Sequence, residues 1–317
     1  MVDPAEAARW GITPGFHDIF GVWHETTPLA REALTAAISR GHASPADAAQ
    51  SGAATRAYQC GDRRMWGLAV QLYALRSSRN WGHGDFADLA ALIDVLAPMG
   101  CSAIGLNPLH ALFLERPEDA SPYSPNSRIF LNPLYIAIDQ VPDCPDAASL
   151  GIAAKLADVR ETDQVRYAEV AALKLSALRA GYIRFRNDAS GERSGDFETF
   201  YAEGGDALQR FVAFEVLRRR YGPVPWWKWP PEWRQPSSAA IVRLFDDATS
   251  EDDPLFHIYL QWLAARQLQQ CQGRARQRGM PIGLYIDLAV GIDHRLSEPF
   301  VARQQGLNRF GEPLFDE

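Results

Sequence analysis

A chain of 317 residues with 47% hydrophobic and 22% charged residues can form one large folded domain or two ordinary ones, which excludes an intrinsically disordered protein. Its formal net charge of −7 disfavours nucleic-acid partners, because attraction to phosphate needs a basic face. No apolar run approaches the roughly 20 residues of a membrane span, and the first residues carry no signal-peptide pattern, so we expect no membrane partner.

The four cysteines are Cys60, Cys101, Cys144 and Cys271, and their wide spacing excludes a Cys-x-x-Cys metal hook. Reduced thiols in a cytoplasmic protein are the simplest interpretation, because disulfides are rare in that compartment. Cys101 is expected to be a small core residue beside a buried strand. No cluster of residues implies a metal ion or an organic cofactor, so neither is predicted.

Residues 1–62 are predicted to form a small helical lead-in. Asp3-Pro4 and Thr27-Pro28 each provide a helix start, because proline fits the first turn of a helix, where its missing N–H is not needed. Ser44-Pro45 predicts a third short helix.

Residues 63–140 follow the pattern strand, turn, helix, strand and long polar loop. Apolar runs at 66–73 and 102–106 predict the two strands, and an amphipathic run at 86–97 predicts the helix between them. Parallel strands need such a crossover, which is right-handed. In a β/α barrel the active-site residues lie on the loops that follow strands. The loops after these two runs are therefore the first places to look for a site.

Residues 141–254 are predicted to be a helical insertion, with helices at 147–158, 164–187, 195–221 and 238–245. Between the last two, residues 223–233 interleave four tryptophans with four prolines, a composition that argues against regular helix or sheet. This segment is either a rigid aromatic plug that covers the helices or a platform on which sugar rings stack.

Residues 255–291 are predicted to contain a helix from 255 onward and a third buried strand at 280–290. Residues 292–317 are predicted to be a divergent tail, because their apolar residues follow no sustained helical or strand spacing. Asp287 is the one carboxylate in the strand pattern, where apolar residues are expected on both sides. A carboxylate in that position must be paired, hydrogen-bonded or functional.

Several sequence stretches between residues 66 and 291 resemble the amylomaltase family, the 4-alpha-glucanotransferases or disproportionating enzymes of the long bacterial type. The matching stretches, in the family's order, are 66–73 (WGLAVQLY), 80–85 (NWGHGD), 104–110 (IGLNPLH), 121–128 (SPYSPNSR), 132–135 (NPLY), 261–262 (QW), 266–267 (RQ) and 283–291 (GLYIDLAVG). The resemblance implies an α/β fold in which this chain forms a partial (β/α)8 TIM barrel. It also implies retaining transfer of α-1,4-glucan segments in maltodextrin, glycogen or starch metabolism, with α-1,4-glucans and maltooligosaccharides as partners.

The same resemblance implies substrate-binding residues. Tyr123 matches the tyrosine of the family's Ser-Pro-Tyr motif, which lines the sugar sites, and Ser121 begins that motif. Asn80 and Trp81 match the loop after the first strand. Asp287 matches the acidic position of a strand near the active site.

Each of these positions also has a structural interpretation. Tyr123 can pack on its neighbouring prolines, and Asp287 can serve as a hydrogen-bond acceptor within the fold. Asp85, in the same loop as Asn80, is favoured as the cap of the helix that starts at residue 86. His110, at the end of the second-strand motif, is favoured as a satisfied turn residue.

The family's catalytic motifs are missing from the chain, so we assign no catalytic residue. Retaining transfer needs a carboxylate nucleophile about 5 Å from a carboxylic acid that protonates the leaving oxygen. The nucleophile motif Arg-x-Asp-His, the acid motif Glu-Asp-Leu-Gly and the stabiliser motif His-Asp-Asn do not occur. Asp293-His294 follows a glycine and lies too early in the family's order, and His17-Asp18 is followed by isoleucine.

We therefore expect a truncated, N-terminal part of a 4-alpha-glucanotransferase that is inactive or very weak by itself. Strand edges left open in an incomplete barrel would allow self-association. The alternative is a non-catalytic glucan-binding or interaction protein. A third hypothesis, an enzyme that uses Asp287 with Glu298 or Asp293, is the least favoured.

Overall fold

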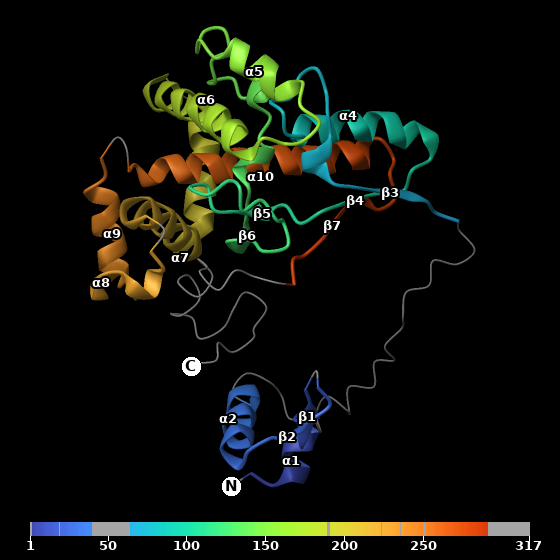
Figure 1. Cartoon of the computed structure of the whole chain (residues 1–317), viewed down its shortest axis with the longest axis vertical. Coiled ribbons are helices and arrows are strands. Elements are labelled where there is room, and N and C mark those ends of the chain that lie inside the picture. The colour runs from blue at the N-terminus through green and yellow to red at the C-terminus, as the bar shows by residue number, and fades with distance from the viewer. Residues whose placement is uncertain are drawn as a thin grey trace. The chain divides into compact units, whose positions relative to one another are not determined.

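The computed structural model describes residues 2–18, 20–39, 64–188, 191–222, 224–234, 236–249 and 252–290. The chain divides into two units, residues 1–63 and 64–317, which are treated separately below (Figure 1). The predicted division of the larger unit into barrel, insertion and tail stays a prediction. The helix expected at Ser44-Pro45, the thiol of Cys60, and Asp293, His294 and Glu298 all lie outside the described residues.

The first unit contains a β-hairpin between two helices: α1 (Pro4–Arg9), β1 (Gly15–His17), β2 (Trp23–Glu25) and α2 (Pro28–Ser39). Both helix predictions are confirmed, and the Asp3 carboxylate caps α1 by accepting from the Ala5 N–H. A purely helical lead-in is wrong, however, because the backbone N–H groups of Phe20 and Val22 donate to Asp18 and close a hairpin turn. Strands of three residues are too short to show an alternating pattern in the sequence.

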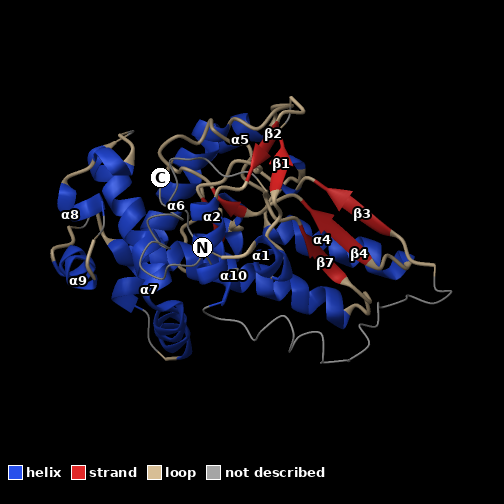
Figure 2. Ribbon diagram, turned by 90° about the horizontal axis from the view of Figure 1, so that it is seen from below, coloured by secondary structure: helices blue, strands red, loops and turns tan. Residues whose placement is uncertain are grey.

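The second unit contains a three-stranded parallel sheet in the order β3-β4-β7 (Figure 2). Its strands are β3 (Gly67–Val70), β4 (Ala103–Leu106) and β7 (Gly283–Ile286). The helix α4 (Phe86–Leu96) connects β3 to β4, and α10 (Pro254–Gln277) leads into β7. All three predicted strands are thus present, although shorter than expected. The architecture is α/β with parallel strands.

Within the part of the chain that the structure describes, one side of the sheet is covered by helices and the other is open. Ile104 and Leu106 of β4 are buried on the side along which α4 and α10 lie, where they join a core with Leu89 and Ile93 of α4 (Figure 1). On the other side, Tyr285 of β7 is 68% exposed. The prediction of a third strand buried on both faces is therefore wrong. An apolar run does not reveal whether a second layer covers the far face.

The long loop after β4 contains a second hairpin that the sequence pattern did not indicate. Its strands are β5 (His110–Ala111) and β6 (Ser127–Leu131), which pair antiparallel. Gln261 of α10 fixes this hairpin, because its amide accepts from the Leu131 N–H and donates to the Leu131 carbonyl oxygen, at 2.9 and 2.8 Å. Short 3₁₀ turns accompany the strands: Leu72–Ala74, Ala97–Met99, Pro133–Tyr135 and Ile138–Gln140.

The helices predicted for residues 141–254 are present, with shifted boundaries. Its helices are α5 (Ala153–Arg160), α6 (Tyr167–Asp188), α7 (Glu192–Tyr221), α8 (Pro231–Arg234) and α9 (Ser238–Asp246), with a 3₁₀ turn at Trp226–Lys228. The helix expected from residue 147 starts only at Ala153, because Asp146 binds the Ser149 N–H in a turn and Gly151 has a positive φ of 68°. Gly205, with φ 52°, kinks α7.

The tryptophan-proline segment forms an aromatic plug on the insertion. Trp226 and Trp229 are buried against Phe214 and Leu217 of α7, which favours the plug over the sugar platform. The expectation of no regular structure is wrong for α8, because Pro231 occupies the first helical position, where proline is tolerated. Cys101 is buried in the sheet core, as predicted. No helix among the described residues has the length and apolarity that crossing a bilayer requires.

Candidate functional site

The loop after β3 ends in a capping box that starts α4. The Asp85 carboxylate accepts from the backbone N–H groups of Ala87 and Asp88, and the Asp88 carboxylate accepts from the Asp85 N–H. These reciprocal bonds satisfy N–H groups that a helix leaves free at its first turn. The interpretation of Asp85 as a helix cap is confirmed.

Arg79 ties this capping box to the rest of the loop. Its guanidinium pairs with the buried carboxylates of Asp85 and Asp88 and with the partly exposed carboxylate of Asp139. Burial raises the pKa of Asp85, although Lys174 and Arg79 oppose this. Burial alone would also raise the pKa of Asp88, but hydrogen bonds from Ser77 and Asn80 lower it below its usual value.

Asn80 and Trp81, two of the predicted sugar-binding residues, lie inside this network. Asn80 is fully buried, and its amide donates to the Asp88 carboxylate at 2.8 Å and to the Leu75 carbonyl oxygen at 3.1 Å. Trp81 is buried in the main core. Protein atoms fill the space around both side chains, so their observed role is to support the loop. The sugar contact that the resemblance implies for them stays a prediction.

A buried lysine connects the loop to the insertion. Lys174 of α6 donates to the carbonyl oxygens of Leu134 and Ile136, at 2.5 and 2.8 Å, and its Nζ lies 4.0 Å from Oδ2 of Asp85. Burial lowers the pKa of Lys174 to about 8, with partial compensation from Asp85. The insertion therefore fixes the segment after β6, which carries the matched stretch 132–135.

A different group of polar residues lies at the carboxyl end of the sheet. His110 follows β4, Arg128 lies in β6 and Asp287 follows β7, and all three are half-buried. The Ala289 N–H donates to Nε2 of His110 at 3.4 Å. Burial lowers the pKa of His110, the Arg128 charge lowers it further, and the Asp287 charge opposes both. Arg128 and Asp287 are thus both close enough to His110 to act on it electrostatically.

Of this group, only Asp287 was predicted as a site residue. Its backbone N–H donates to the Leu106 carbonyl oxygen, which extends the pairing of β7 with β4 and places the carboxyl group at the end of the strand. Sequence reasoning missed Arg128 and assigned His110 to a turn. Both belong to matched stretches, 121–128 and 104–110, and that was the only signal for them.

Tyr123 and Ser121 lie on the loop between β5 and β6, which leaves and returns at this same end of the sheet. Tyr123 is 49% exposed, so its ring is available to a ligand, and Ser121 is exposed. The loop is held at its base, where the Asn126 N–H donates to the Ala111 carbonyl oxygen and the Asn126 amide donates to Glu215 at 2.6 Å.

Asp158 of α5 and Glu169 of α6 form an exposed pair of carboxyl groups that shares the Arg166 guanidinium. Two further pairs, Asp85 with Asp88 and Glu215 with Glu115, contain buried carboxyl groups. Asp85 and Asp88 are enclosed by the capping box. Burial, together with the charge of Glu115, raises the pKa of Glu215 to about 8, a combination typical of acid–base pairs. However, the cavity beside Glu215 measures about 10 Å³, which is only enough for a single water molecule.

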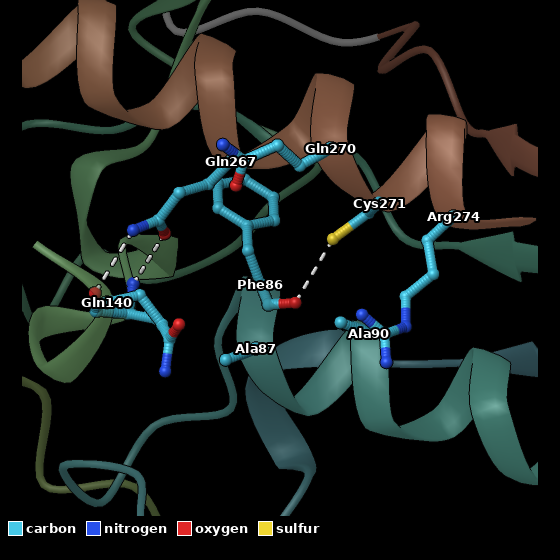
Figure 3. A pocket seen from close by; sticks show the side chains of 9 residues that line it. Phe86, Ala87, Ala90, Gln140, Gln267, Gln270, Cys271 and Arg274 are labelled. Atoms are coloured by element: carbon cyan, nitrogen blue, oxygen red, sulfur yellow. Dashed lines mark hydrogen bonds between the residues drawn. The ribbon is translucent and has the colours of Figure 1, made fainter. Parts of the chain in front are cut away.

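The cavity drawn in Figure 3 lies between α4 and α10 and measures about 130 Å³. The Gln267 amide exchanges two hydrogen bonds with the backbone of Ala137, and the Cys271 thiol donates to the Phe86 carbonyl oxygen at 3.1 Å. Burial raises the pKa of Cys271 to about 12, so it remains a thiol. These groups join the helices, and the cavity lies away from the ends of the strands. It is not the candidate site.

A wider hollow of about 650 Å³ runs beside β7, between Leu284 and Ile286 of the strand and Leu268 and Gln272 of α10. It lies on the helix-covered side of the sheet. Within the described ranges, no three His, Cys, Asp or Glu side chains gather closely enough to hold a metal ion. The candidate site is therefore the carboxyl end of the sheet, with Asp287, His110 and Arg128 and the loop that bears Tyr123.

Comparisons with known proteins give one consistent family match. A family model described as 4-alpha-glucanotransferase matches residues 70–305. The 4-alpha-glucanotransferase of Haemophilus influenzae is 37% identical over 247 residues, which cover 72% of this chain and 35% of that protein. The Mycobacterium tuberculosis H37Rv protein of the same name is 35% identical, covering 73% of this chain and 33% of its own length.

Solved structures give the same result. Amylomaltase from Corynebacterium glutamicum superposes with a TM-score of 0.60 at 31% identity, covering 76% of this chain and 32% of that chain. Amylomaltase from Streptococcus agalactiae in complex with acarbose also superposes with a TM-score of 0.60, over 80% of this chain and 49% of that chain. At 18% identity this match supports the fold alone. The chain spans about a third of the length of these two curated relatives.

Proposed function

Because this chain belongs to the 4-alpha-glucanotransferase family, we propose that residues 64–290 bind an α-1,4-glucan at the carboxyl ends of β3, β4 and β7. The activity to which this binding belongs is the retaining transfer of glucan segments in maltodextrin, glycogen or starch metabolism. The sheet is the first part of a (β/α)8 barrel, and the helical insertion supports it. The protein acts in the cytoplasm.

The observation that carries the proposal is the group of Asp287, His110 and Arg128 at the end of the sheet from which the loop with the exposed Tyr123 extends. Carboxylate, imidazole and guanidinium groups supply the acceptors and donors that sugar hydroxyls need, and an exposed aromatic ring supplies a face for sugar C–H groups. In parallel α/β sheets, ligands bind outside the carboxyl ends of the strands. Binding is therefore assigned to this end of the sheet.

The catalytic step is not assigned to this chain. Transfer through a covalent glycosyl-enzyme needs two carboxyl groups about 5 Å apart around the anomeric carbon. Asp85 and Asp88 are enclosed by protein, and the cavity beside Glu215 holds only a single water molecule. Asp158 and Glu169 are already paired with Arg166 on the helical insertion. The chain therefore binds glucan without efficient turnover.

A second candidate function is a non-catalytic glucan-binding or interaction protein. The observation that favours it is the open sheet, because β3 and β7 form its two edges and Tyr285 faces solvent. Unpaired strand edges offer backbone groups to another chain. Self-association through these edges is part of this alternative.

We expect Tyr123→Ala to weaken binding of maltoheptaose about tenfold, or about 1.4 kcal/mol, because the variant removes the exposed ring face. Isothermal titration calorimetry measures the dissociation constant. Met99→Ala is the control, because Met99 is also exposed, at 63%, but precedes the amino end of β4. Absence of binding heat in the wild-type chain would remove the proposal. An unchanged affinity in Tyr123→Ala would remove the tyrosine from the site.

We expect the purified chain to release little or no glucose from maltotriose, because its sequence lacks the motifs that supply the nucleophile and the acid in this family. A coupled glucose assay with a full-length family enzyme as positive control measures this. Robust release that Asp287→Asn abolishes would contradict the expectation and would identify Asp287 as a catalytic carboxylate.

A further inference from the structure

The loop between β5 and β6, residues 112–126 and called here the Tyr123 loop, is attached to α7 near both of its ends. On the returning side, the Asn126 amide donates to Oε1 of Glu215 at 2.6 Å. On the outgoing side, Nε of Arg218 donates to the Glu115 carboxylate at 2.7 Å, and Nη2 of Arg218 pairs with the same oxygen. Glu215 and Arg218 are three positions apart on α7 and therefore lie on one face of the helix. The two attachments of the loop thus meet on the same face of α7.

Arg218 is buried and has hydrogen-bonding capacity to spare. It is 1% exposed, and its guanidinium lies over the Phe113 ring, 4.7 Å from the ring centroid. Within the described part of the chain, its Nη1 has no hydrogen-bond partner. A guanidinium has five N–H donors, so Arg218 can donate to a second carboxylate. Glu215 is close enough for the charge of Arg218 to act on it.

The protonation state of Glu215 decides which pair is favoured. Burial, together with the charge of Glu115, raises the pKa of Glu215 to about 8. While Glu215 is neutral, Arg218 and Glu115 compensate each other. When Glu215 is ionised, two carboxylates compete for one guanidinium, and a buried charge without a partner is costly. Glu115 is partly exposed and can be solvated by water instead, whereas Glu215 is buried, so the guanidinium is drawn to Glu215.

The other polar groups around Glu215 do not change their charge in the same pH range. His257 of α10 lines the small cavity beside Glu215, and burial lowers the pKa of His257 to about 3, so its ring is neutral. The Asn126 amide does not titrate. Arg116 of the loop pairs with Asp119 at 2.7 Å and stays charged throughout. Of these groups, Glu215 is the one whose charge changes between pH 6.5 and 9.

We propose that Arg218 exchanges Glu115 for Glu215 when Glu215 releases its proton to the solvent, and that this exchange frees the Tyr123 loop from α7. Glu215, Arg218 and Glu115 are then positioning residues, because they hold the loop while Tyr123 meets the ligand. The loop is attached below about pH 8 and released above it. The consequence for glucan binding rests on the proposed function of residues 64–290, whereas the movement of the loop does not.

Hydrogen–deuterium exchange of the full chain at pH 6.5 and 9, corrected for the intrinsic exchange rate, measures this release. The backbone N–H groups of Arg116, Asp119, Ser124 and Asn126 are hydrogen-bonded and report on the loop. We expect their protection to fall about tenfold or more at pH 9, because the attached state is favoured only while Glu215 keeps its proton. Peptides from α4, which contributes to the main core, report on global unfolding. Loop amides as strongly protected as those of α4 would exchange only through global unfolding and would overturn the proposal.

Substitutions in and around the loop separate the charge of Glu215 from its structural role. In Glu215→Gln the side chain still accepts from Asn126 but cannot ionise, so we expect equal protection of the loop at both pH values. Glu115→Gln removes the loop's partner for Arg218, so protection is expected to be lower already at pH 6.5. Glu118→Gln, which replaces an exposed carboxylate of the same loop, is the matched control and is expected to keep the wild-type pH dependence. A pH dependence that survives Glu215→Gln, or wild-type protection in Glu115→Gln, overturns the proposal.

Calorimetric titration with maltoheptaose distinguishes the exchange from the proposed function. We expect the dissociation constant of the wild-type chain to rise from pH 6.5 to 9 by up to about tenfold, the effect expected for removing the Tyr123 ring. The dissociation constant of Glu215→Gln is expected to stay constant. Release of the loop at pH 9 without a change in affinity supports the exchange and removes Tyr123 from the glucan site. A loss of affinity while the loop stays protected overturns the exchange and leaves the proposed function intact.

Discussion

Asp85→Ala is expected to lower the free energy of unfolding of the larger unit by about 3–5 kcal/mol. The variant removes the cap of α4 and one of the buried carboxylates that pairs with Arg79. It also leaves the fully buried ammonium of Lys174 without its nearest carboxylate. Breaking a buried charge pair from one side is costly, because the remaining charge stays desolvated. Urea denaturation followed by tryptophan fluorescence measures the change.

The control for this prediction uses the same arginine. Asp139 also pairs with Arg79, but its carboxylate is partly exposed, so water can replace it. We expect Asp139→Ala to cost about 1 kcal/mol or less, as for other solvent-exposed pairs. Equal effects of the two substitutions would show that the burial of Asp85 does not govern the stability of the loop.

We expect the stability of the chain to fall between pH 6.5 and 8 by about 1.5 kcal/mol through Glu215 alone. Burial and the charge of Glu115 raise the pKa of Glu215 to about 8 from an ordinary value of 4.5. In this window the unfolded carboxyl is ionised while the folded one keeps its proton. The folded state therefore binds more protons, and raising the pH favours unfolding.

Glu215→Gln is expected to flatten this pH dependence, because a glutamine stays neutral and its carbonyl oxygen still accepts from Asn126. Other buried groups change the stability chiefly outside this pH range. Burial lowers the pKa of His257 to about 3, and the contribution of Lys174, whose pKa is about 8, develops chiefly above pH 8. Urea denaturation at pH 6.5, 7.2 and 8 gives the slopes. Glu169→Gln, an exposed carboxylate on α6, is the control. A variant with the wild-type slope would show that Glu215 is already ionised.

These two predictions concern the supports of the candidate site. The capping box fixes the loop after β3, and the bond from Asn126 to Glu215 fixes the base of the loop that bears Tyr123. Each support joins a matched stretch of the sequence to another element. Substitutions in these supports are expected to change the affinity for glucan by shifting the loops, whereas Tyr123→Ala changes it by removing the ring that contacts the sugar.

Local sequence patterns were sufficient for the elements whose signals lie within a few residues. Apolar runs located β3, β4 and β7, helical periodicity located α4, α6 and α10, and the Asp85 side chain before Phe86 indicated the cap. Motif resemblance gave the family, which the match over residues 70–305 shows. The boundaries of α5 and the hairpin in the first unit were missed, because turns held by side chains such as Asp18 leave no periodic signal.

Only the tertiary structure decided which polar residues are buried and which face solvent. Asn80 and Trp81 occur in a polar stretch of sequence, yet the capping box and the core enclose them. Asn126 and Glu215 are 89 positions apart, and no local pattern predicts that they meet. The grouping of His110 with Asp287 likewise depends on β7 pairing with β4 across more than 170 residues. A sequence records which residues prefer burial, but the partner that satisfies a buried polar group is set by elements that meet only when the chain has folded.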